Sequence, residues 1–324
     1  MIGSMESNGP GIEYREIKRA DLGSFDQLIV QGIGKLERST GLDELALSLF
    51  QSLHSPSVWT FLKILQWVGR APIKVFVGVD SGRVLGTASV IMLEKSGYVA
   101  GVATDSQARR RGIATHLLER IHLEVQQERK EWAVLDVETE NDTAIDLYRK
   151  LGYVQTAVFG WYVGPPPELA DPGDGVATPV SGSQMAEVAD WVRRNLPPSI
   201  ADPLPPTRKR LSYVETVIRG PRTPIKTWRL TDAGETRAAV RACYFDRIRT
   251  GFILPLAFDS VPTVEPLTSL FAPAVRWVRS SGGTRLVITF PVPSTGLEQT
   301  MEVLKLPLTV STALMVRPSR EGSV

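Results

Sequence analysis

Two periods of apolar and polar residues alternate along the chain. Apolar side chains recur at every second position, or in short runs, in segments that predict strands: residues 12–17, 73–93, 97–104, 132–138 and 153–163. They recur three or four positions apart in segments that predict helices: 18–53, 57–69, 109–125 and 143–151. Ser81-Gly82 divides residues 73–93 into two strands, because glycine supplies the positive φ of a tight turn.

The second half of the chain repeats the order of the first. Residues 73–93 align with 225–245 without a gap, 97–106 align with 251–260 after a two-residue insertion, and 132–138 align with 285–291. A collinear repeat of this length predicts two domains of one fold. With the proline-rich stretch after Gly164 as linker, the expected divisions are an unstructured leader, a first domain, a linker, a second domain and a tail: residues 1–11, 12–164, 165–175, 176–318 and 319–324.

Composition excludes some functions. The 324 residues carry 37 basic and 35 acidic side chains, a net charge of +2. This balance argues against a nucleic-acid-binding protein, which usually shows a basic excess or stripe. Cys243 is the only cysteine and the three histidines are scattered, so the sequence predicts neither a disulfide framework nor a metal site.

The N-terminus and the most apolar segment favour a cytoplasmic protein without a membrane partner. Residues 1–11 lack the basic and apolar regions of a signal peptide. Residues 57–69 are too few to span a bilayer and include Lys63 and Gln66. The aromatic segment 59–67 is interpreted as a buried helix, with an acceptor wall or the contact of a homodimer as alternatives.

A candidate anion site lies in residues 104–116, TDSQARRRGIATH, where a strand leads into a helix expected to begin near Arg109. The N-terminus of a helix carries unpaired N–H groups and a partial positive charge. Gly112 and Ala114 lack bulk, so a phosphate can approach the backbone closely. The pattern R-x-x-G-x-A is short and frequent by chance, so an exposed basic helix start is the alternative.

A second segment, LDVETENDTAIDLYRKLGY at 135–153, gives this site its context. Together with V-A-T…R-R-R-G-I-A, it resembles the GNAT superfamily of acetyl-CoA-dependent N-acetyltransferases over residues 12–163, in both motifs and in their separation. The resemblance implies the α/β (α+β) class, with two GNAT-type domains that each have a mixed, mostly antiparallel central sheet flanked by helices. It also implies direct transfer from acetyl-CoA to a primary amine: a protein N-terminus, a small amine or an amino sugar.

The resemblance also implies roles for single residues. Backbone groups of Val102, Ala103 and Thr104 would pair with the pantetheine arm like an added strand. Amides and basic side chains of the anion site would hold the pyrophosphate; the positions are Arg109, Arg110, Arg111, Gly112, Ile113, Ala114 and Thr115. Asn141 would contact the arm of the cofactor, and Tyr148 would act as general acid for the departing thiolate.

The general base is harder to place. Strand alternation puts Asp136, Glu138 and Glu140 on one face, where three carboxylates would favour a cationic acceptor and could raise one pKa by repulsion. LDVETEN resembles the L-E-V-x-x-x-N strand of protein N-terminal acetyltransferases, whose glutamate acts as base through water, and Asp136 stands at that position. Both Asp136 and Glu138 are therefore candidate catalytic residues, with a solvated strand face as the alternative.

The second copy has lost these groups. Residues 109–114 correspond to TVEPLT at 263–268, where Pro266 removes an amide donor and Glu265 repels phosphate. Asp136, Asn141 and Tyr148 correspond in turn to Thr289, Ser294 and Met301. We expect a degenerate domain that packs on the first, walls the acceptor cleft or binds a partner. The alternative to an enzyme is an acyl-CoA-binding regulatory or partner-binding module, but the intact Asn141 and Tyr148 favour catalysis.

Overall fold

The structure is a computed structural model that describes residues 11–60, 73–169, 177–206, 223–258 and 264–319. Its strands are β1 (Glu13–Glu16), β2 (Ile73–Asp80), β3 (Arg83–Met92), β4 (Ser96–Thr104), β5 (Trp132–Glu138), β6 (Val154–Gly164), β7 (Thr178–Pro179), β8 (Ile225–Asp232), β9 (Glu235–Phe245), β10 (Thr250–Phe258), β11 (Arg285–Val292) and β12 (Leu308–Pro318). Its helices are α1 (Leu22–Gly32), α2 (Lys35–Thr40), α3 (Leu42–Leu53), α5 (Ile113–Gln127), α6 (Asp142–Lys150), α7 (Met185–Asn195), α8 (Pro198–Ala201), α10 (Val264–Ser280) and α11 (Thr295–Val303).

The order of elements follows the pattern predicted from the sequence, with two local differences. The helical segment after β1 is three helices, because Gly34 precedes α2 and Gly41 separates α2 from α3 with a φ of +79°. The helix expected from Arg109 begins at Ile113 instead, because Gly112 takes a left-handed conformation with a φ of +78°. The expected leader, most of the linker, most of the aromatic segment 59–67 and nearly all of the tail lie outside the described residues.

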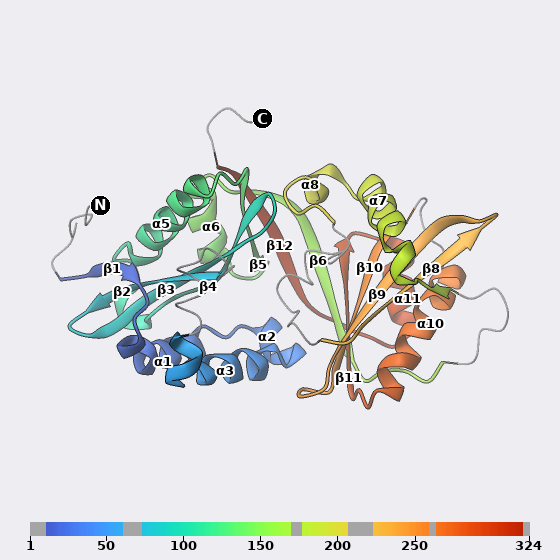
Figure 1. Ribbon diagram of the computed structural model, residues 1–324, viewed down its shortest axis with the longest axis horizontal. Helices are drawn as coiled ribbons and strands as arrows, with labels where there is room; N and C mark the ends of the chain where they lie inside the picture. The colour runs from blue at the N-terminus through green and yellow to red at the C-terminus, as the bar shows by residue number, and fades with distance from the viewer. Residues whose placement is uncertain (1–10, 61–72, 170–176, 207–222, 259–263, 320–324) are drawn as a thin grey trace.

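Among the described residues, the strands form one continuous twelve-stranded sheet (Figure 1). Their order is β1-β2-β3-β4-β5-β12-β6-β11-β10-β9-β8-β7. Neighbouring strands are antiparallel except at β4–β5 and β10–β11, so the expected mixed, mostly antiparallel sheet is confirmed. Helices cover both faces (Figure 1).

The two halves exchange one strand each at the centre of this sheet. β12 leaves the second half to lie between β5 and β6, with Leu314 opposite Asp136 on one side and Ala157 on the other. β6 leaves the first half to lie between β12 and β11, with Trp161 opposite Thr289. The hydrogen-bond ladder therefore runs through both halves without a break. The domain boundaries predicted along the sequence do not capture this exchange of strands.

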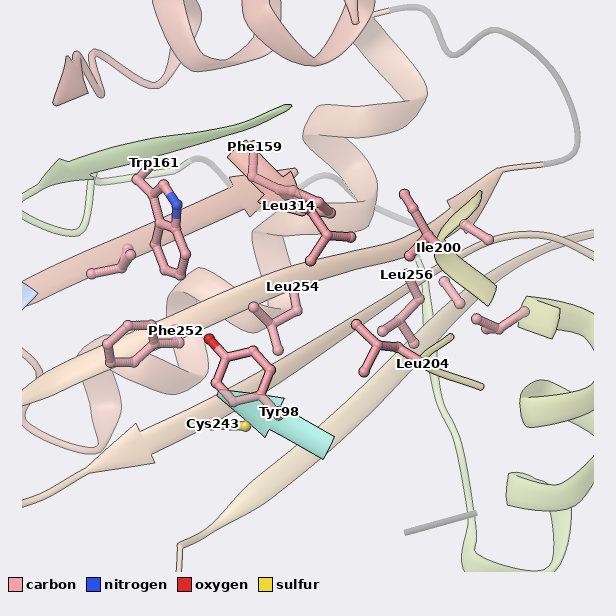
Figure 2. Close-up of a cluster of buried hydrophobic side chains, with 14 of the residues drawn as sticks. Tyr98, Phe159, Trp161, Ile200, Leu204, Cys243, Phe252, Leu254, Leu256 and Leu314 are labelled. Carbon is pink, nitrogen blue, oxygen red and sulfur yellow. The ribbon is translucent and has the colours of Figure 1, made fainter. Parts of the chain in front are cut away.

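The exchange also mixes the hydrophobic cores. Ala313 and Met315 of β12 are fully buried in the core beneath α5 and α6, in the first half. Tyr162 of β6 is buried in the core of α10 and α11, in the second half, stacked on Phe290. On the other face, one core joins residues of both halves, including Tyr98 and Phe159 with Phe252 and Leu254 (Figure 2).

The exchange predicts that a truncation in β12 weakens the whole molecule. Met315→Ala should lower the free energy of unfolding by about 2–5 kcal/mol, because it opens a cavity in the core of the opposite half. Denaturant unfolding, followed by tryptophan fluorescence and by circular dichroism, measures the loss and should show one transition for both halves. Val303→Ala, at an exposed residue of α11, is the control and should change stability by about 0.5 kcal/mol or less. An unchanged stability of Met315→Ala would show that β12 does not complete this core.

Candidate active site

β4 and β5 are neighbours at one end and separate at the other. The two strands pair in parallel over three positions, from Ser96 opposite Trp132 to Tyr98 opposite Val134. Beyond Tyr98, the edge of β4 that faces β5 has no strand partner in the part of the chain that the structure describes. An extended chain with amide groups can add to such an edge as a further strand.

β4 bends where this opening begins. Its register with β3 passes from Ala100 opposite Ser89 to Ala103 opposite Thr87, so β4 has one extra residue, a β-bulge. Gly101 lies in this bulge with a φ of +60°. Residues Ala100 to Thr104 are exposed or half-buried, whereas the preceding four residues of β4 are buried. The bulge was not predicted from the sequence, although a glycine inside a strand is its usual signal.

The loop between β4 and α5 forms a tight turn before the helix. Arg110 and Gly112 both have a left-handed backbone, with φ values of 63° and 78°. Gly112 is the N-cap of α5 and has no side chain with which to bond the first amides. The amides of Ile113, Ala114 and Thr115 accordingly have no acceptor among the described residues. The predicted anion site thus consists of free amides at the start of a fifteen-residue helix.

Buried contacts hold this turn in place. Asp105 is almost fully buried and accepts a hydrogen bond from Arg83 Nη2 at 2.5 Å, while its own N–H donates to Leu85 O at 2.8 Å. At the other end, the His116 ring lies 4.9 Å from the ring of Tyr14 in a stacked arrangement, and its Nδ1 donates to Gly112 O at 2.9 Å. His116 therefore supports the turn.

The three arginines of the turn are exposed, as expected for a cationic rim. Arg111 Nη2 lies 3.8 Å from Asp80 Oδ2, a distance at which the pair is weak. Neither Arg109 nor Arg110 forms an ion pair with a described residue. Their charges are thus available to an anion at the helix N-terminus.

Tyr148 lies on α6, on the face of the sheet that α5 and α6 cover. Its side chain is 6% exposed and packs in the core of this face, with its ring 5.8 Å from that of Tyr153. Its hydroxyl has no hydrogen-bond partner among the described residues. Burial, with a contribution from the charge of Asp136, raises the pKa of the Tyr148 hydroxyl to about 12, so it is protonated at neutral pH.

Asn141 sets the start of α6. Its side-chain oxygen accepts a hydrogen bond from the Ala144 N–H at 3.2 Å, as an N-cap does. The side-chain NH₂ group makes no bond within the described part of the chain, and Asn141 is exposed. At the other end of α6, Gly152 has a φ of +84° and its N–H donates to Arg149 O, an arrangement that is common for a glycine just after a helix C-terminus.

Asp136 lies on the opposite face of β5 from Tyr148. The Tyr98 hydroxyl, at the last paired position of β4, donates a hydrogen bond to Asp136 Oδ1. Burial, and second the charge of Glu37, raise the pKa of the Asp136 carboxyl to about 7. Asp136 and Tyr148 thus lie on the two faces of the sheet at β5, close enough for the charge of Asp136 to raise the pKa of Tyr148.

Glu138 shares the face of Asp136, as strand alternation predicts, and it is bound to the backbone of α2. Its Oε1 accepts a hydrogen bond from the Leu36 N–H at 2.8 Å. Glu140 does not share this face, because β5 ends at Glu138 and Glu140 is an exposed turn residue.

Glu37 is a third carboxylate of this region, and it was not predicted from the sequence. It lies in the first turn of α2, and its Oε2 accepts a hydrogen bond from the Gly34 N–H at 2.9 Å. Burial raises the pKa of Glu37, and the charges of Glu138 and Asp43 raise it further. In the sequence, Glu37 is distinguished only by its position three residues after a glycine, and this spacing is an ordinary signal of a helix N-terminus. Tyr98 was missed because a tyrosine in a strand usually signals packing.

The equivalent opening in the second half is filled with apolar side chains. β10 pairs with β11 in parallel only from Thr250 to Ile253, as β4 pairs with β5. Beyond that point Leu254 and Leu256 are buried with Ile200 of α8 and the nearby Leu204 (Figure 2). Ala100 and Val102 stand at the corresponding positions of β4 and are half-buried. Re-exposing a buried leucine costs about 1.5–3 kcal/mol, which opposes any ligand that would replace these side chains.

The second-half residues that align with Tyr148, Asp136 and Asn141 have no titratable side chain. Met301, which aligns with Tyr148, is fully buried in an apolar core. Thr289, which aligns with Asp136, is 3% exposed. Ser294 precedes α11 without a capping hydrogen bond from its side chain. Neither Asp136 nor Tyr148 therefore has a titratable counterpart here.

Within the described ranges, no group of three or more His, Cys, Asp or Glu side chains is arranged to hold a metal ion. No described helix is long and apolar enough to cross a membrane.

Sequence comparisons match the half that carries the opening. Residues 41–153 match the acetyltransferase (GNAT) family. A segment of 70 residues is 36% identical to N-alpha-acetyltransferase 30 of Xenopus laevis; it is 21% of this chain and spans about a quarter, 26%, of that relative.

Structural comparisons match the whole chain at low identity. A GCN5-related N-acetyltransferase from Sphaerobacter thermophilus is 14% identical with a TM-score of 0.64, covering 98% of each chain. A tandem GNAT protein from the clavulanic acid biosynthesis pathway is 12% identical with a TM-score of 0.55, covering 96% of this chain and all of its own. Residues 41–153 thus match the GNAT acetyltransferase family, and the whole chain has the fold of tandem GNAT proteins.

Proposed function

We propose that the chain is an acetyl-CoA-dependent N-acetyltransferase whose single active site is the β4–β5 opening of the first half. One observation carries the proposal: this opening is flanked by the protonated Tyr148 and by Asp136, whose pKa lies near 7, whereas the equivalent opening of the second half is filled. The second half is then a degenerate copy that takes no acetyl-CoA.

The residues of the opening fit the shape and charge of acetyl-CoA. The unpaired edge of β4 at Val102, Ala103 and Thr104 offers backbone groups to the two amides of the pantetheine arm. The free amides at the start of α5 and the exposed arginines fit the pyrophosphate. The free NH₂ group of Asn141 is a further donor for the arm.

Acetyl transfer needs a neutral amine and a stabilised leaving thiolate. In the proposed reaction, Asp136 accepts a proton from the amine, directly or through water, as the nitrogen bonds to the thioester carbonyl carbon. The carbon–sulfur bond then breaks, and the Tyr148 hydroxyl gives its proton to the departing sulfur, which leaves the amide and the free thiol. The tyrosinate regains a proton from water, and Asp136 releases to water the proton that it took from the amine. Because a thiol pKa near ~8.5 is well below that of Tyr148, hydrogen bonding to the developing thiolate is favoured over early proton transfer.

Within this scheme Glu138 has a supporting place. Its carboxylate is already bound to the Leu36 N–H, so it fixes the start of α2 beside β5. Asp136 has the raised pKa that a base near neutral pH requires. Of the two candidate bases, we therefore assign proton transfer to Asp136 and the placement of α2 to Glu138.

The protonation of Asp136 favours an acceptor with a weakly basic amine. A base with a pKa near 7 can deprotonate an α-amino group, whose pKa is about 7.7–8.0, at far lower cost than a lysine side chain at about 10.4. The sequence likeness to an N-alpha-acetyltransferase points the same way. We therefore propose the α-amino group of a peptide as the acceptor, with small amines and amino sugars as the alternatives.

A turnover screen tests this function. Wild-type protein should release free thiol from acetyl-CoA fastest with a peptide that has a free α-amino group, compared with a small amine and an amino sugar. Tyr148→Phe should lower kcat by about 100-fold or more, because the leaving sulfur loses its donor. Tyr162→Phe, the same change in a buried tyrosine of β6 that packs in the core of α10 and α11, should keep full activity. If no amine class raises thiol release above the rate with water, the proposed function is wrong.

Calorimetry tests the location and number of cofactor sites. Acetyl-CoA should bind once per chain, and Gly112→Glu should weaken this binding by about tenfold or more, since it adds a negative charge at the phosphate position. Gly82→Glu is a matched control, because Gly82 has a φ of +79° in the β2–β3 turn, with open space around it. Binding of two molecules per chain would show that the second half is not degenerate. An unchanged affinity of Gly112→Glu for acetyl-CoA would place the pyrophosphate site elsewhere.

The pH profile tests the base. The pH profile of kcat/KM should have an acid limb: below about pH 7 the value should fall tenfold for each pH unit, because only the carboxylate form of Asp136 accepts a proton. Glu37→Gln removes a negative charge that raises this pKa, so the limb should move to lower pH. Glu119→Gln, at an exposed residue of α5, is the control and should leave the limb in place. If Glu37→Gln leaves the acid limb at the same pH, the charge of Glu37 does not act on the base.

A further inference from the structure

The turn between β9 and β10 is longer than its counterpart in the first half. Five residues separate Phe245 from Gly251, whereas three separate Leu93 from Gly97 at the aligned positions. These two additional residues are the insertion in the otherwise collinear repeat. They extend a turn of the second half, and the structure shows where that turn leads.

The longer turn contacts the corner between α2 and α3 in the first half. Gly41 forms this corner, and a Cβ placed there would overlap Nη1 of Arg285 and lie 3.6 Å from Cβ of Ile248. Ile248 is 8% exposed and shares a core with Leu36 of α2. Beside them, Arg247 Nη1 donates a hydrogen bond to Ser48 Oγ on α3.

Hydrogen bonds join the β9–β10 turn to the residues around the start of β11. The carbonyl of Arg249 accepts the N–H groups of Thr284 at 2.9 Å and Arg285 at 3.2 Å, and Arg249 Nε donates to Gly282 O at 3.0 Å. The hydroxyl of Thr250, a fully buried residue, donates to Ile248 O at 3.0 Å. Ile248 and Arg285 therefore belong to one rigid unit that is anchored to the second half.

The contacted corner is one short helix away from the proposed base. α2 has six residues, so its two ends are about 9 Å apart at ~1.5 Å per residue. At its far end, Leu36 N–H is bound by Glu138, and Glu37 lies close enough to raise the pKa of Asp136. A helix this short moves as a body, so a shift at Gly41 reaches Glu37.

We propose that the second half positions the acceptor side of the active site: Ile248 and Arg285 hold the α2–α3 corner at Gly41, so that α2 presents Glu37 to Asp136. This rests on the proposed function for the identity of the site. It gives the degenerate half a role that needs no ligand of its own. Ile248 and Arg285 are positioning residues, since neither touches the reacting groups.

Two truncations test the contact. Ile248→Ala and Arg285→Ala should speed hydrogen exchange of the amides in residues 34–41, while β2 and β3 stay protected. The KM for a peptide with a free α-amino group should rise about fivefold or more, and the KM for acetyl-CoA should stay within about twofold, because only the acceptor side moves. Leu308→Ala and Arg279→Ala, at exposed positions of the second half, are the matched controls and should change neither quantity.

The same pair offers a double-mutant test. Gly41→Ala should also speed exchange of residues 34–41, because alanine is strained at a φ of +79° and its Cβ overlaps Arg285 Nη1. Adding Arg285→Ala to Gly41→Ala should increase the exchange by less than the two single effects combined, because both changes act on one contact. This arm stays decisive if Ile248→Ala fails to fold.

The outcomes separate the two proposals. Unchanged exchange in both truncations, with wild-type turnover intact, would overturn the positioning role alone. Absence of turnover in wild-type protein with every amine would overturn the proposed function, and the exchange data would still decide the contact. A rise in both KM values together would also overturn the proposal, because it would show a general loss of structure.

Discussion

The pairing of β12 with β5 and β6 is the contact on which the rest of the molecule depends. β5 carries Asp136 and Glu138 on one face and supports the core beneath Tyr148 on the other, and β12 closes both arrangements. Two domains joined by a linker would retain separate edges, separate cores and freedom to move. Here one hydrogen-bond ladder and one shared core fix the second half against the first.

The opening in the first half exists because β4 and β5 stop pairing after Tyr98. A sheet gains stability from every paired strand edge, yet β4 parts from β5 after Tyr98 and leaves backbone groups without a strand partner in the described structure. In the second half the equivalent opening is closed: leucines replace alanine and valine, and Ile200 of α8 packs against them. The two halves thus share one architecture, and apolar side chains fill in one half the space that stays open in the other.

Local features of the fold could be read from the sequence because they depend on near neighbours. The Ser81-Gly82 turn, Gly152 after α6 and the common face of Asp136 and Glu138 follow from turn geometry and strand alternation alone. The strand exchange could not be predicted, because β6 and β12 each follow a helix and show similar apolar patterns, so either strand would suit either sheet. Glu37 and Tyr98 were missed for a related reason. Each has an ordinary local explanation, and only the tertiary fold brings them to Asp136.

The strand exchange also sets a constraint on biosynthesis. The ribosome releases β5 and β6 long before β12, and at about 5–20 residues per second the interval is on the order of ten seconds. During that time the edges of β5 and β6 that will face β12 lack this neighbour, and the core beneath Tyr148 is incomplete. Such edges invite pairing with other chains. The nascent protein therefore passes through a vulnerable stage in which chaperones, or low expression temperature, decide how much of it reaches the native fold.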